Sequence, residues 1–162
     1  MIHGGEHERN RRAGTENMPA ILGMAKAVEV CSERMDEDRR YLLNLSETLF
    51  KKIHQAIPRV TLNGHPTERL PGNLNLSFEG IEGESLLLSL DLKGVAASSG
   101  SACTSGSVEP SHVLVAMNVT AELAQSSIRF TLGRSNTMED IDYVAQLLPE
   151  IVERLRSMSP IE

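Results

Sequence analysis

The chain has 162 residues, 40% of them hydrophobic and 23% charged, which suits one globular protein with a substantial core. Its formal net charge of −6 argues against a protein that binds nucleic acid or acidic membranes through a basic face. No apolar run reaches the roughly 18 residues that span a bilayer, the N-terminus does not look like a secretory signal, and the two cysteines are far apart. We therefore expect a cytoplasmic protein without a disulfide framework.

Residues 1–15 are rich in glycine and arginine and predict a loop. Helical periodicity then runs from Glu16 to Ile57, as one long helix or as two with a bend near 35–38, and Pro58 ends it. Cys31 lies on the apolar stripe of this helix, so we expect it to be buried. Short strands are predicted at 60–62 and at 73–78, where polar and apolar residues alternate.

Further along the chain, a helix is predicted over 84–92, a strand over 95–97, a loop over 98–108 and a helix from 110 to about 117. Residues 127–132 alternate like a strand. Thr137 and Asp140 have the spacing of a capping box before the last helix. This order predicts an α+β fold, with helices packed on a small, mostly antiparallel sheet.

Cys103 lies in the middle of the small-residue segment 98–108. A lone cysteine is usually a small core residue, but here no large apolar neighbour is present for it to pack against. Gly100 and Gly106 would allow the segment to move. An exposed thiol on such a segment suits a carrier of sulfur or acyl groups.

Arg129 lies between Ile128 and Phe130 on a predicted strand, so its side chain is expected on the opposite face from theirs. Two interpretations are open from the residues alone. One is a structural salt bridge, and the other is a guanidinium fork that holds a substrate carboxylate with two hydrogen bonds.

Gly14, Thr15, Glu16 and Asn17 precede the first long helix. A hydroxyl and free backbone N–H groups at a helix start can bind an anion, while Thr15 or Asn17 can equally serve as an ordinary helix cap. His3 and His7 have a spacing that would suit a metal on a helix, but Gly4 and Gly5 between them disfavour a helix, and no metal site is predicted.

Three motifs in this sequence are similar, in order and spacing, to signatures of the cysteine desulfurases. The run SSGSACTSGSVEPSH (98–112) resembles the active-site loop of the group with the longer loop. The segments HGGEHERNRRAGTEN (3–17) and SSIRFTLGR (126–134) resemble two further signatures. The likeness covers essentially the whole chain, but only the C-terminal portion of a typical family member.

The resemblance implies a homodimeric enzyme of the aspartate-aminotransferase-like fold that uses pyridoxal phosphate as an electron sink for L-cysteine. It implies that Cys103 attacks the substrate sulfur, leaving alanine and a protein persulfide. Arg129 would bind the substrate carboxylate, and Thr15 would bind the cofactor phosphate of the neighbouring subunit. The sulfur would pass to iron–sulfur scaffold or sulfur-carrier proteins.

On this resemblance, residues 1–17 correspond to the end of the large cofactor domain, and residues 18–162 to the C-terminal small domain. None of the four lysines, Lys26, Lys51, Lys52 and Lys93, has the Ser-x-His-Lys type context of the family's cofactor lysine. The chain alone is therefore expected to be inactive and to need an N-terminal pyridoxal-phosphate domain. The alternative is a stand-alone, catalytically inactive sulfur-carrier or scaffold-binding module. In either case part of the 18–57 helix would lack its cover, which predicts self-association.

Overall fold

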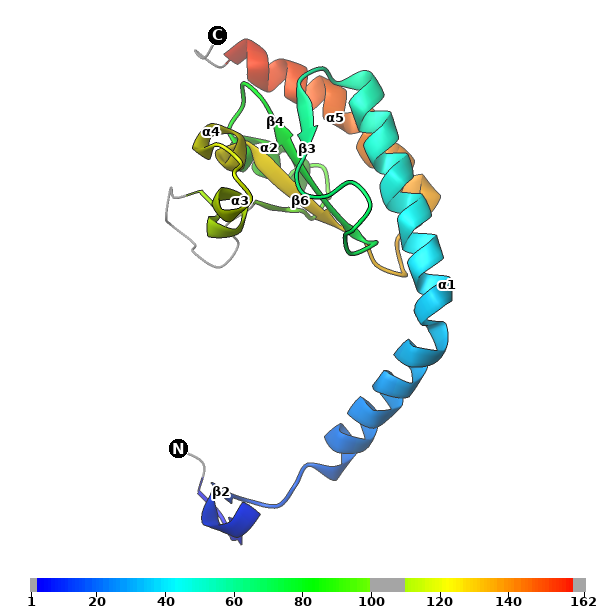
Figure 1. The fold of residues 1–162 in the computed structure, drawn as a ribbon, viewed down its shortest axis with the longest axis vertical. Helices are drawn as coiled ribbons and strands as arrows, with labels where there is room; N and C mark the ends of the chain where they lie inside the picture. The colour runs from blue at the N-terminus through cyan, green and yellow to red at the C-terminus, as the bar shows by residue number, and fades with distance from the viewer. Residues whose placement is uncertain (1–2, 100–109, 159–162) are drawn as a thin grey trace. The chain divides into compact units, whose positions relative to one another are not determined.

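The structure is a computed structural model, and it describes residues 3–99 and 110–158 (Figure 1). The chain divides into two compact units, residues 1–37 and 38–162, which are described separately below. Helix α1, Met18–Ala56, contributes its first part to one unit and the rest to the other. Among the described residues, no helix combines the length and apolar character needed to cross a membrane.

The first unit begins with a small hairpin instead of the loop that was predicted for residues 1–15. Strand β1, Glu6–His7, pairs antiparallel with β2, Arg12–Ala13, and the 3-10 turn η1, Glu8–Asn10, joins them. Glu8, Arg9 and Asn10 all have positive φ, a geometry that sequence periodicity does not reveal in residues other than glycine. The expectation of an all-loop segment was wrong for this reason.

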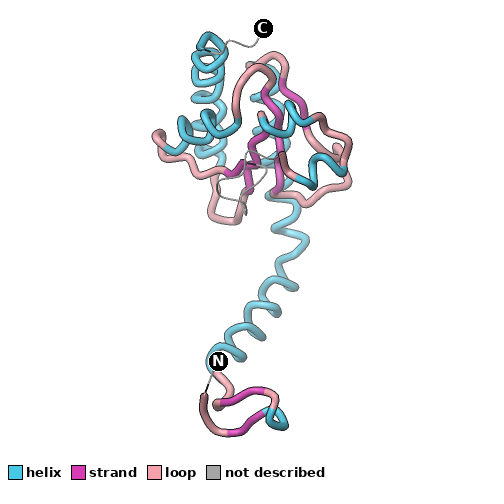
Figure 2. Tube along the Cα trace, turned by 90° about the vertical axis from the view of Figure 1, so that its left-hand side faces the viewer, coloured by secondary structure: helices cyan, strands magenta, loops and turns pink. Residues whose placement is uncertain are grey.

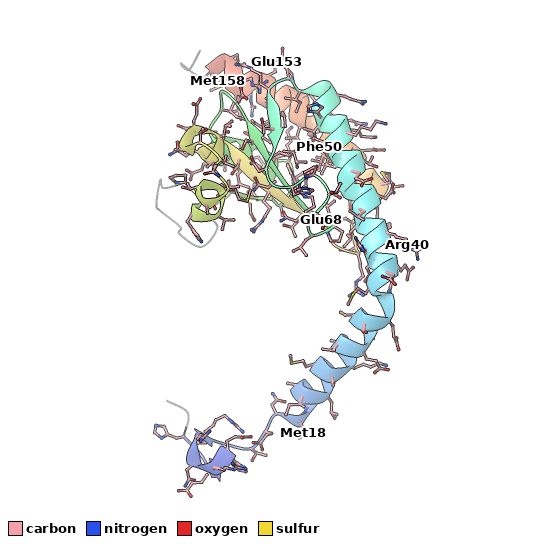
Figure 3. The ribbon with its side chains drawn as sticks, viewed as in Figure 1. Met18, Arg40, Phe50, Glu68, Glu153 and Met158 are labelled. Atoms are coloured by element: carbon pink, nitrogen blue, oxygen red, sulfur yellow. The ribbon has the colours of Figure 1, made fainter. Side chains whose placement is uncertain are left out.

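Helix α1 is one unbroken helix, so the first of the two predicted alternatives is confirmed (Figure 2). Its N-terminus is capped by Asn17, whose Oδ1 accepts a hydrogen bond of 3.1 Å from the backbone N–H of Ala20. Figure 3 marks Met18 at the start of the helix and Phe50 near its other end.

The second unit contains a four-stranded antiparallel sheet in the order β3-β4-β6-β5. Its strands are β3 (Val60–Leu62), β4 (Asn73–Phe78), β5 (Ser98–Ser99) and β6 (Ser127–Thr131). The predictions for β3, β4 and β6 are confirmed. The strand predicted over 95–97 was wrong, because the Val95 N–H still donates to Leu90 O at the end of the preceding helix. Pairing with β6 starts only at Ser98.

One face of this sheet is apolar and is covered by three helices. They are the second part of α1, α2 (Gly83–Asp91) and α5 (Met138–Met158). Alternate residues of β4 and β6, together with one stripe of each helix, form a continuous core: Leu45, Leu49, Ile53, Leu74, Leu76, Phe78, Leu86, Leu90, Ile128, Phe130, Ile141 and Leu148. The predicted α+β arrangement of helices on a small antiparallel sheet is thereby confirmed.

Two short helices follow residue 109: α3 (His112–Ala116) and α4 (Ala121–Gln125). Only α3 was predicted. Helix α4 packs on the polar face of the sheet, where its Leu123 O accepts a hydrogen bond from Ser77 Oγ. The capping box of α5 is confirmed, since the Thr137 N–H donates to Asp140 Oδ2 and the Asp140 N–H donates to Thr137 Oγ1.

Cys31 is exposed, so the prediction of a buried position was wrong. Its apolar neighbours on α1 are also exposed, including Ile21 at 49%, Leu22 at 63% and Val28 at 61%. Periodicity identifies an apolar face, but it does not say which polypeptide covers that face. The predicted uncovered part of the helix is present, while self-association stays a prediction.

We expect Gly83→Ala to lower the thermal unfolding midpoint clearly. A Cβ at Gly83 would lie 2.6 Å from Gln125 O and 3.0 Å from Ser127 O, and backbone atoms cannot rotate away as a side chain can. Overpacking of this kind costs about 1–3 kcal/mol. Gly133→Ala is the matched control, because its nearest neighbouring atom would be 4.0 Å away. Equal midpoints for the two variants in a thermal melt would contradict this packing.

Candidate functional site

The polar face of the sheet carries a pocket of about 330 Å³, within the size range of small-molecule sites. Its floor is formed by β4 and β6, and its walls by the β3–β4 connection and by α3. The lining residues are largely polar: Asn63, Gly64, His65, Glu68, Arg69, Leu70, Asn73, Asn75, Ser111, Val113, Leu114, Met117 and Arg129.

Arg129 lies on β6 between two buried neighbours, and its own side chain is exposed in this pocket, as the alternation predicted. Within 3–99 and 110–158, no hydrogen bond or ion pair engages its guanidinium. Of the two interpretations left open by the sequence, the salt bridge therefore has no partner in these ranges. An unengaged guanidinium in a pocket is suited to bind an anion.

Three side chains next to Arg129 form a connected set of hydrogen bonds. Asn63 Nδ2 donates to Asn75 Oδ1 at 2.7 Å and to Ser77 Oγ at 2.8 Å, and Ser77 Oγ donates to Leu123 O at 2.6 Å. Asn63 is 5% exposed and Ser77 is fully buried. Buried amides and hydroxyls that are hydrogen-bonded in this way hold a fixed orientation.

A second cation, Arg69, supports the wall of the pocket. Its Nε donates to Asn73 O at 3.2 Å and its second terminal nitrogen donates to Asn63 O at 3.1 Å. Partial burial lowers the pKa of Arg69. His65 is exposed, and its Nδ1 accepts a hydrogen bond from the backbone N–H of Glu68 at 2.8 Å. Arg69 thus serves mainly to hold the wall, because its donors are already engaged.

Described residues on both sides of the range 100–109 lie at or near this pocket. Ser98, which precedes that range, pairs directly with Arg129 across β5 and β6. Ser111, just after it, lines the pocket and is 6% exposed. Cys103 itself lies outside the described residues.

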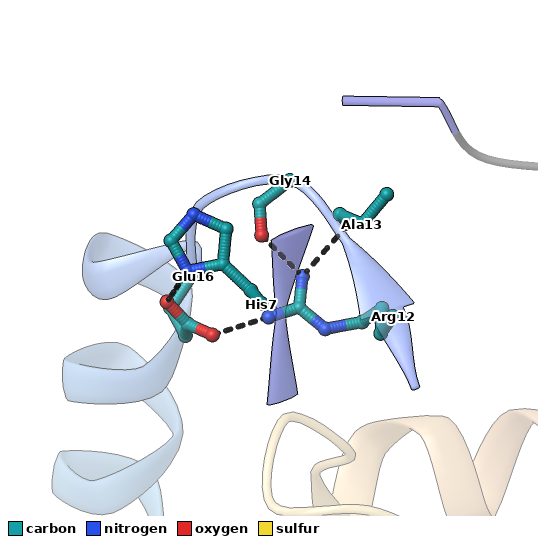
Figure 4. A network of polar contacts seen from close by, with 5 residues as sticks. All are labelled: His7, Arg12, Ala13, Gly14 and Glu16. Atoms are coloured by element: carbon teal, nitrogen blue, oxygen red, sulfur yellow. Dashed lines mark hydrogen bonds and ion pairs between the residues drawn. The ribbon is translucent and has the colours of Figure 1, made fainter. Parts of the chain in front are cut away.

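Thr15 belongs to the other unit, where its side chain is exposed and Asn17 caps the helix instead. The neighbouring residues form a polar network (Figure 4). Arg12 donates to Gly14 O at 3.0 Å and also hydrogen-bonds to Glu16 Oε1, while His7 Nδ1 lies 3.8 Å from Glu16 Oε2. This network holds the hairpin against the start of α1 and leaves the Thr15 hydroxyl available.

We expect Glu16 to titrate below its ordinary range. A backbone hydrogen bond, then the charges of Arg12 and His7, lower the pKa of its carboxyl. A carboxyl whose pKa is lower in the folded chain contributes stability above its unfolded pKa, and that contribution is lost as the pH falls through the folded pKa. The hairpin should therefore loosen only in acid. Carboxyl chemical shifts measured against pH by NMR check this, and a midpoint for Glu16 at or above the ordinary range of a glutamate carboxyl would contradict it.

The four lysines do not offer a covalent attachment site for pyridoxal phosphate. All four are exposed. Lys26 pairs with Glu29 at 3.0 Å, and Lys52 pairs with Asp142. An aldehyde cofactor needs a lysine held within a binding site, whereas these four side chains are exposed to solvent. The described lysines therefore do not fit the covalent bond, and the contact of Thr15 with the cofactor phosphate stays a prediction.

Sequence reasoning missed most of this pocket. Asn63 follows the first predicted short strand and was expected only to close it. Asn75 and Ser77 lie on the polar side of an alternating strand, and alternation predicts only that they lie opposite the core. The signal available was the pattern Asn73-Leu74-Asn75-Leu76-Ser77, in which amides and a hydroxyl stand where charged residues are usual on a solvated face. Leu123 O, the acceptor for the Ser77 hydroxyl, comes from a helix that was not predicted.

Comparison with known proteins matches this architecture to one enzyme family. A sequence model described as aminotransferase class-V matches residues 3–144. The chain is 53% identical over 161 residues to a cysteine desulfurase IscS of Methanosarcina thermophila, and 51% identical over 160 residues to one of Dictyoglomus turgidum. Each alignment covers 99% of this chain, but only 40% and 41% of the relative.

Solved structures agree. A NifS-like protein from Rickettsia africae has a TM-score of 0.78 and 33% identity, covering 94% of this chain and 39% of that one. Another NifS-like protein has a TM-score of 0.79 and 32% identity, covering 96% and 39%. The chain thus spans about 40% of the length of the relatives it matches. From the match over residues 3–144, the chain belongs to the class-V aminotransferase family.

Proposed function

We propose that this chain is the portion of a cysteine desulfurase that binds the substrate carboxylate and accepts its sulfur. The overall reaction converts L-cysteine and a protein thiol into L-alanine and a protein persulfide. The observation that carries the proposal is the guanidinium of Arg129, which no side chain within 3–99 and 110–158 engages and which lies in a pocket that Ser111 also lines. The 53% identity to a cysteine desulfurase supports it.

Arg129 would hold the substrate by its carboxylate. A guanidinium offers two parallel N–H donors that match the two carboxylate oxygens. The strand under it is paired on both sides, with Asn75 on β4 and with Ser98 on β5. A side chain mounted on a central strand positions its ligand more accurately than one on a loop. This contact fixes the orientation of the amino acid in the pocket.

Cys103 would be the nucleophile. Its thiolate attacks the sulfur of the substrate, the substrate carbon–sulfur bond breaks, and the electron pair stays with the carbon that becomes the methyl group of alanine. Two sulfurs are then joined on the protein, and no external oxidant is required.

Pyridoxal phosphate, when bound, supplies the electron withdrawal that makes the carbon–sulfur bond labile. In this chain Thr15 would donate its hydroxyl to the phosphate. The cofactor lysine would come from polypeptide outside residues 1–162, in keeping with the 40% coverage of the relatives. On this proposal residues 1–17 end the large cofactor domain and residues 18–162 form the small domain.

We expect the complete enzyme to act in the cytoplasm as a homodimer, with Thr15 facing the cofactor of the other subunit. Its persulfide would pass to an iron–sulfur scaffold or a sulfur-carrier protein. The uncovered apolar face of α1 around Ile21, Leu22 and Val28 is where the rest of such an assembly would pack.

The proposal is tested by sulfide release from L-cysteine with pyridoxal phosphate and a thiol reductant. The purified chain alone should release none. A completed enzyme, defined here as this chain joined to the part of the Methanosarcina thermophila relative outside the matched region, should release sulfide. Absence of release by the folded, cofactor-loaded completed enzyme would overturn the proposal and favour a sulfur-carrier or scaffold-binding module.

A further inference from the structure

The orientation of the Asn75 amide follows from the hydrogen bonds behind it. A backbone carbonyl such as Leu123 O can only accept, so Ser77 must give it its one hydroxyl hydrogen. Ser77 Oγ can then only accept from Asn63, which must present its NH2 group at 2.8 Å. The same nitrogen lies 2.7 Å from the Asn75 side chain, which must therefore present its oxygen.

These hydrogen bonds fix the direction of the Asn75 side-chain amide. Its oxygen is turned toward Asn63 and accepts a hydrogen bond from it. Its NH2 group therefore lies on the opposite side, away from Asn63. Because a backbone carbonyl can only accept, each of the two amides has one orientation that satisfies these hydrogen bonds.

Asn75 is also the residue nearest to Arg129 across the sheet. The two are directly opposed on β4 and β6. The Asn75 backbone O accepts from the Asn63 N–H on the β3 side, whereas Phe78 N–H donates to Ser126 O on the β6 side. Asn75 and Arg129 therefore form a non-hydrogen-bonded pair, the kind whose side chains approach more closely. Both line the same pocket.

We infer that Asn75 is a second donor to the substrate carboxylate, beside Arg129, and that Ser77 and Asn63 are the positioning residues that hold it so. The inference rests on the proposed function for its ligand. Its physical content is the direction in which the Asn75 amide faces. Because its oxygen is turned toward Asn63, Asn75 presents its NH2 group on the other side, and that donor group cannot accept a hydrogen bond from the Arg129 guanidinium.

The orientation is measurable in the ligand-free chain without any activity. Hydrogen exchange of side-chain NH2 groups, followed by NMR on the 15N-labelled chain, should show protected protons for Asn63 and rapidly exchanging protons for Asn75. Ser77→Ala removes the hydroxyl that fixes the direction of these hydrogen bonds, and it should abolish the protection of the Asn63 NH2 group. Protection of the Asn75 NH2 group, or of neither amide, would overturn the inference.

Kinetics of the completed enzyme test the binding role. Asn75→Leu removes one donor to a charged group and should raise KM for L-cysteine about 10-fold with kcat nearly unchanged. Asn75→Asp keeps the bond to Asn63 but places an anion beside Arg129, so KM should rise further than in Asn75→Leu. Asn44→Asp, an exposed change on α1, is the matched control and should leave KM unaltered.

Two results separate this inference from the proposed function. If the completed enzyme releases sulfide and Arg129→Gln raises KM, but Asn75→Asp is no worse than Asn75→Leu, the inference is wrong and the function stands. If the completed enzyme releases no sulfide, the function fails and Asn75 loses its assigned ligand, while the exchange measurement still decides the orientation of its amide.

Discussion

Arg129→Gln is expected to lower kcat/KM of the completed enzyme for L-cysteine by about 100-fold or more. The variant loses two charge-assisted hydrogen bonds to the substrate carboxylate, each worth about 1.5–3 kcal/mol, and about 1.4 kcal/mol corresponds to a factor of ten. Arg129→Lys keeps the charge but not the fork, so it should recover only part of the loss. The steady-state rate of sulfide release is measured for the unaltered enzyme and for both variants.

A substrate without the negative charge shows whether the lower kcat/KM of Arg129→Gln results from the lost contact with the carboxylate. L-Cysteine methyl ester has the same thiol and amine but no carboxylate, so the unaltered enzyme should strongly prefer L-cysteine. Arg129→Gln should remove most of that preference, as expected when both halves of one interaction are deleted. If the variant lost activity equally with both compounds, Arg129 would act through the fold or through another group.

Cys103→Ser is expected to abolish the formation of alanine and sulfide by the completed enzyme. A hydroxyl at this position is a far weaker nucleophile toward sulfur and cannot hold a persulfide. Binding of L-cysteine, followed by the change in cofactor absorbance, should persist because Arg129 is unaltered. Cys31→Ser is the matched control, since Cys31 is the other cysteine of the chain and is exposed on α1.

Full activity of Cys103→Ser would remove Cys103 from the mechanism. Equal loss in Cys31→Ser and Cys103→Ser would point to a general effect on folding or assembly. Only loss confined to position 103 agrees with the proposed transfer of sulfur to that thiol.

The parts of the fold that sequence patterns predicted are those governed by local chemistry. Alternation identified β4 and β6. A capping box identified the start of α5, because the side chains of Thr137 and Asp140 each accept a hydrogen bond from the backbone N–H of the other residue. The strand predicted over 95–97 was misplaced because Val95 is bound to the end of α2 through Leu90 O. This hydrogen bond is a local feature of the helix end, and a period-two pattern of apolar residues does not reveal it.

The candidate site was predicted only at the residues whose chemistry stands out. Arg129 is conspicuous as a cation in an apolar strand, and the structure places it in a pocket. Asn63 and Asn75 were not singled out, because their role depends on a register between strands and on Leu123 O from a separate helix. Cys31 was wrongly expected in the core, since an apolar stripe does not reveal what covers it.

The most direct test of the proposed function is to locate the sulfur on the protein after one turnover. The completed enzyme is mixed with L-cysteine without reductant, alkylated, digested, and its cysteine peptides are weighed by mass spectrometry. We predict a gain of about 32 Da, one sulfur atom, on the peptide that contains Cys103, with the peptide that contains Cys31 unchanged and one alanine formed per persulfide. Alanine formed without added sulfur on Cys103, or sulfur found on Cys31 instead, would contradict the assignment of Cys103 as the sulfur acceptor.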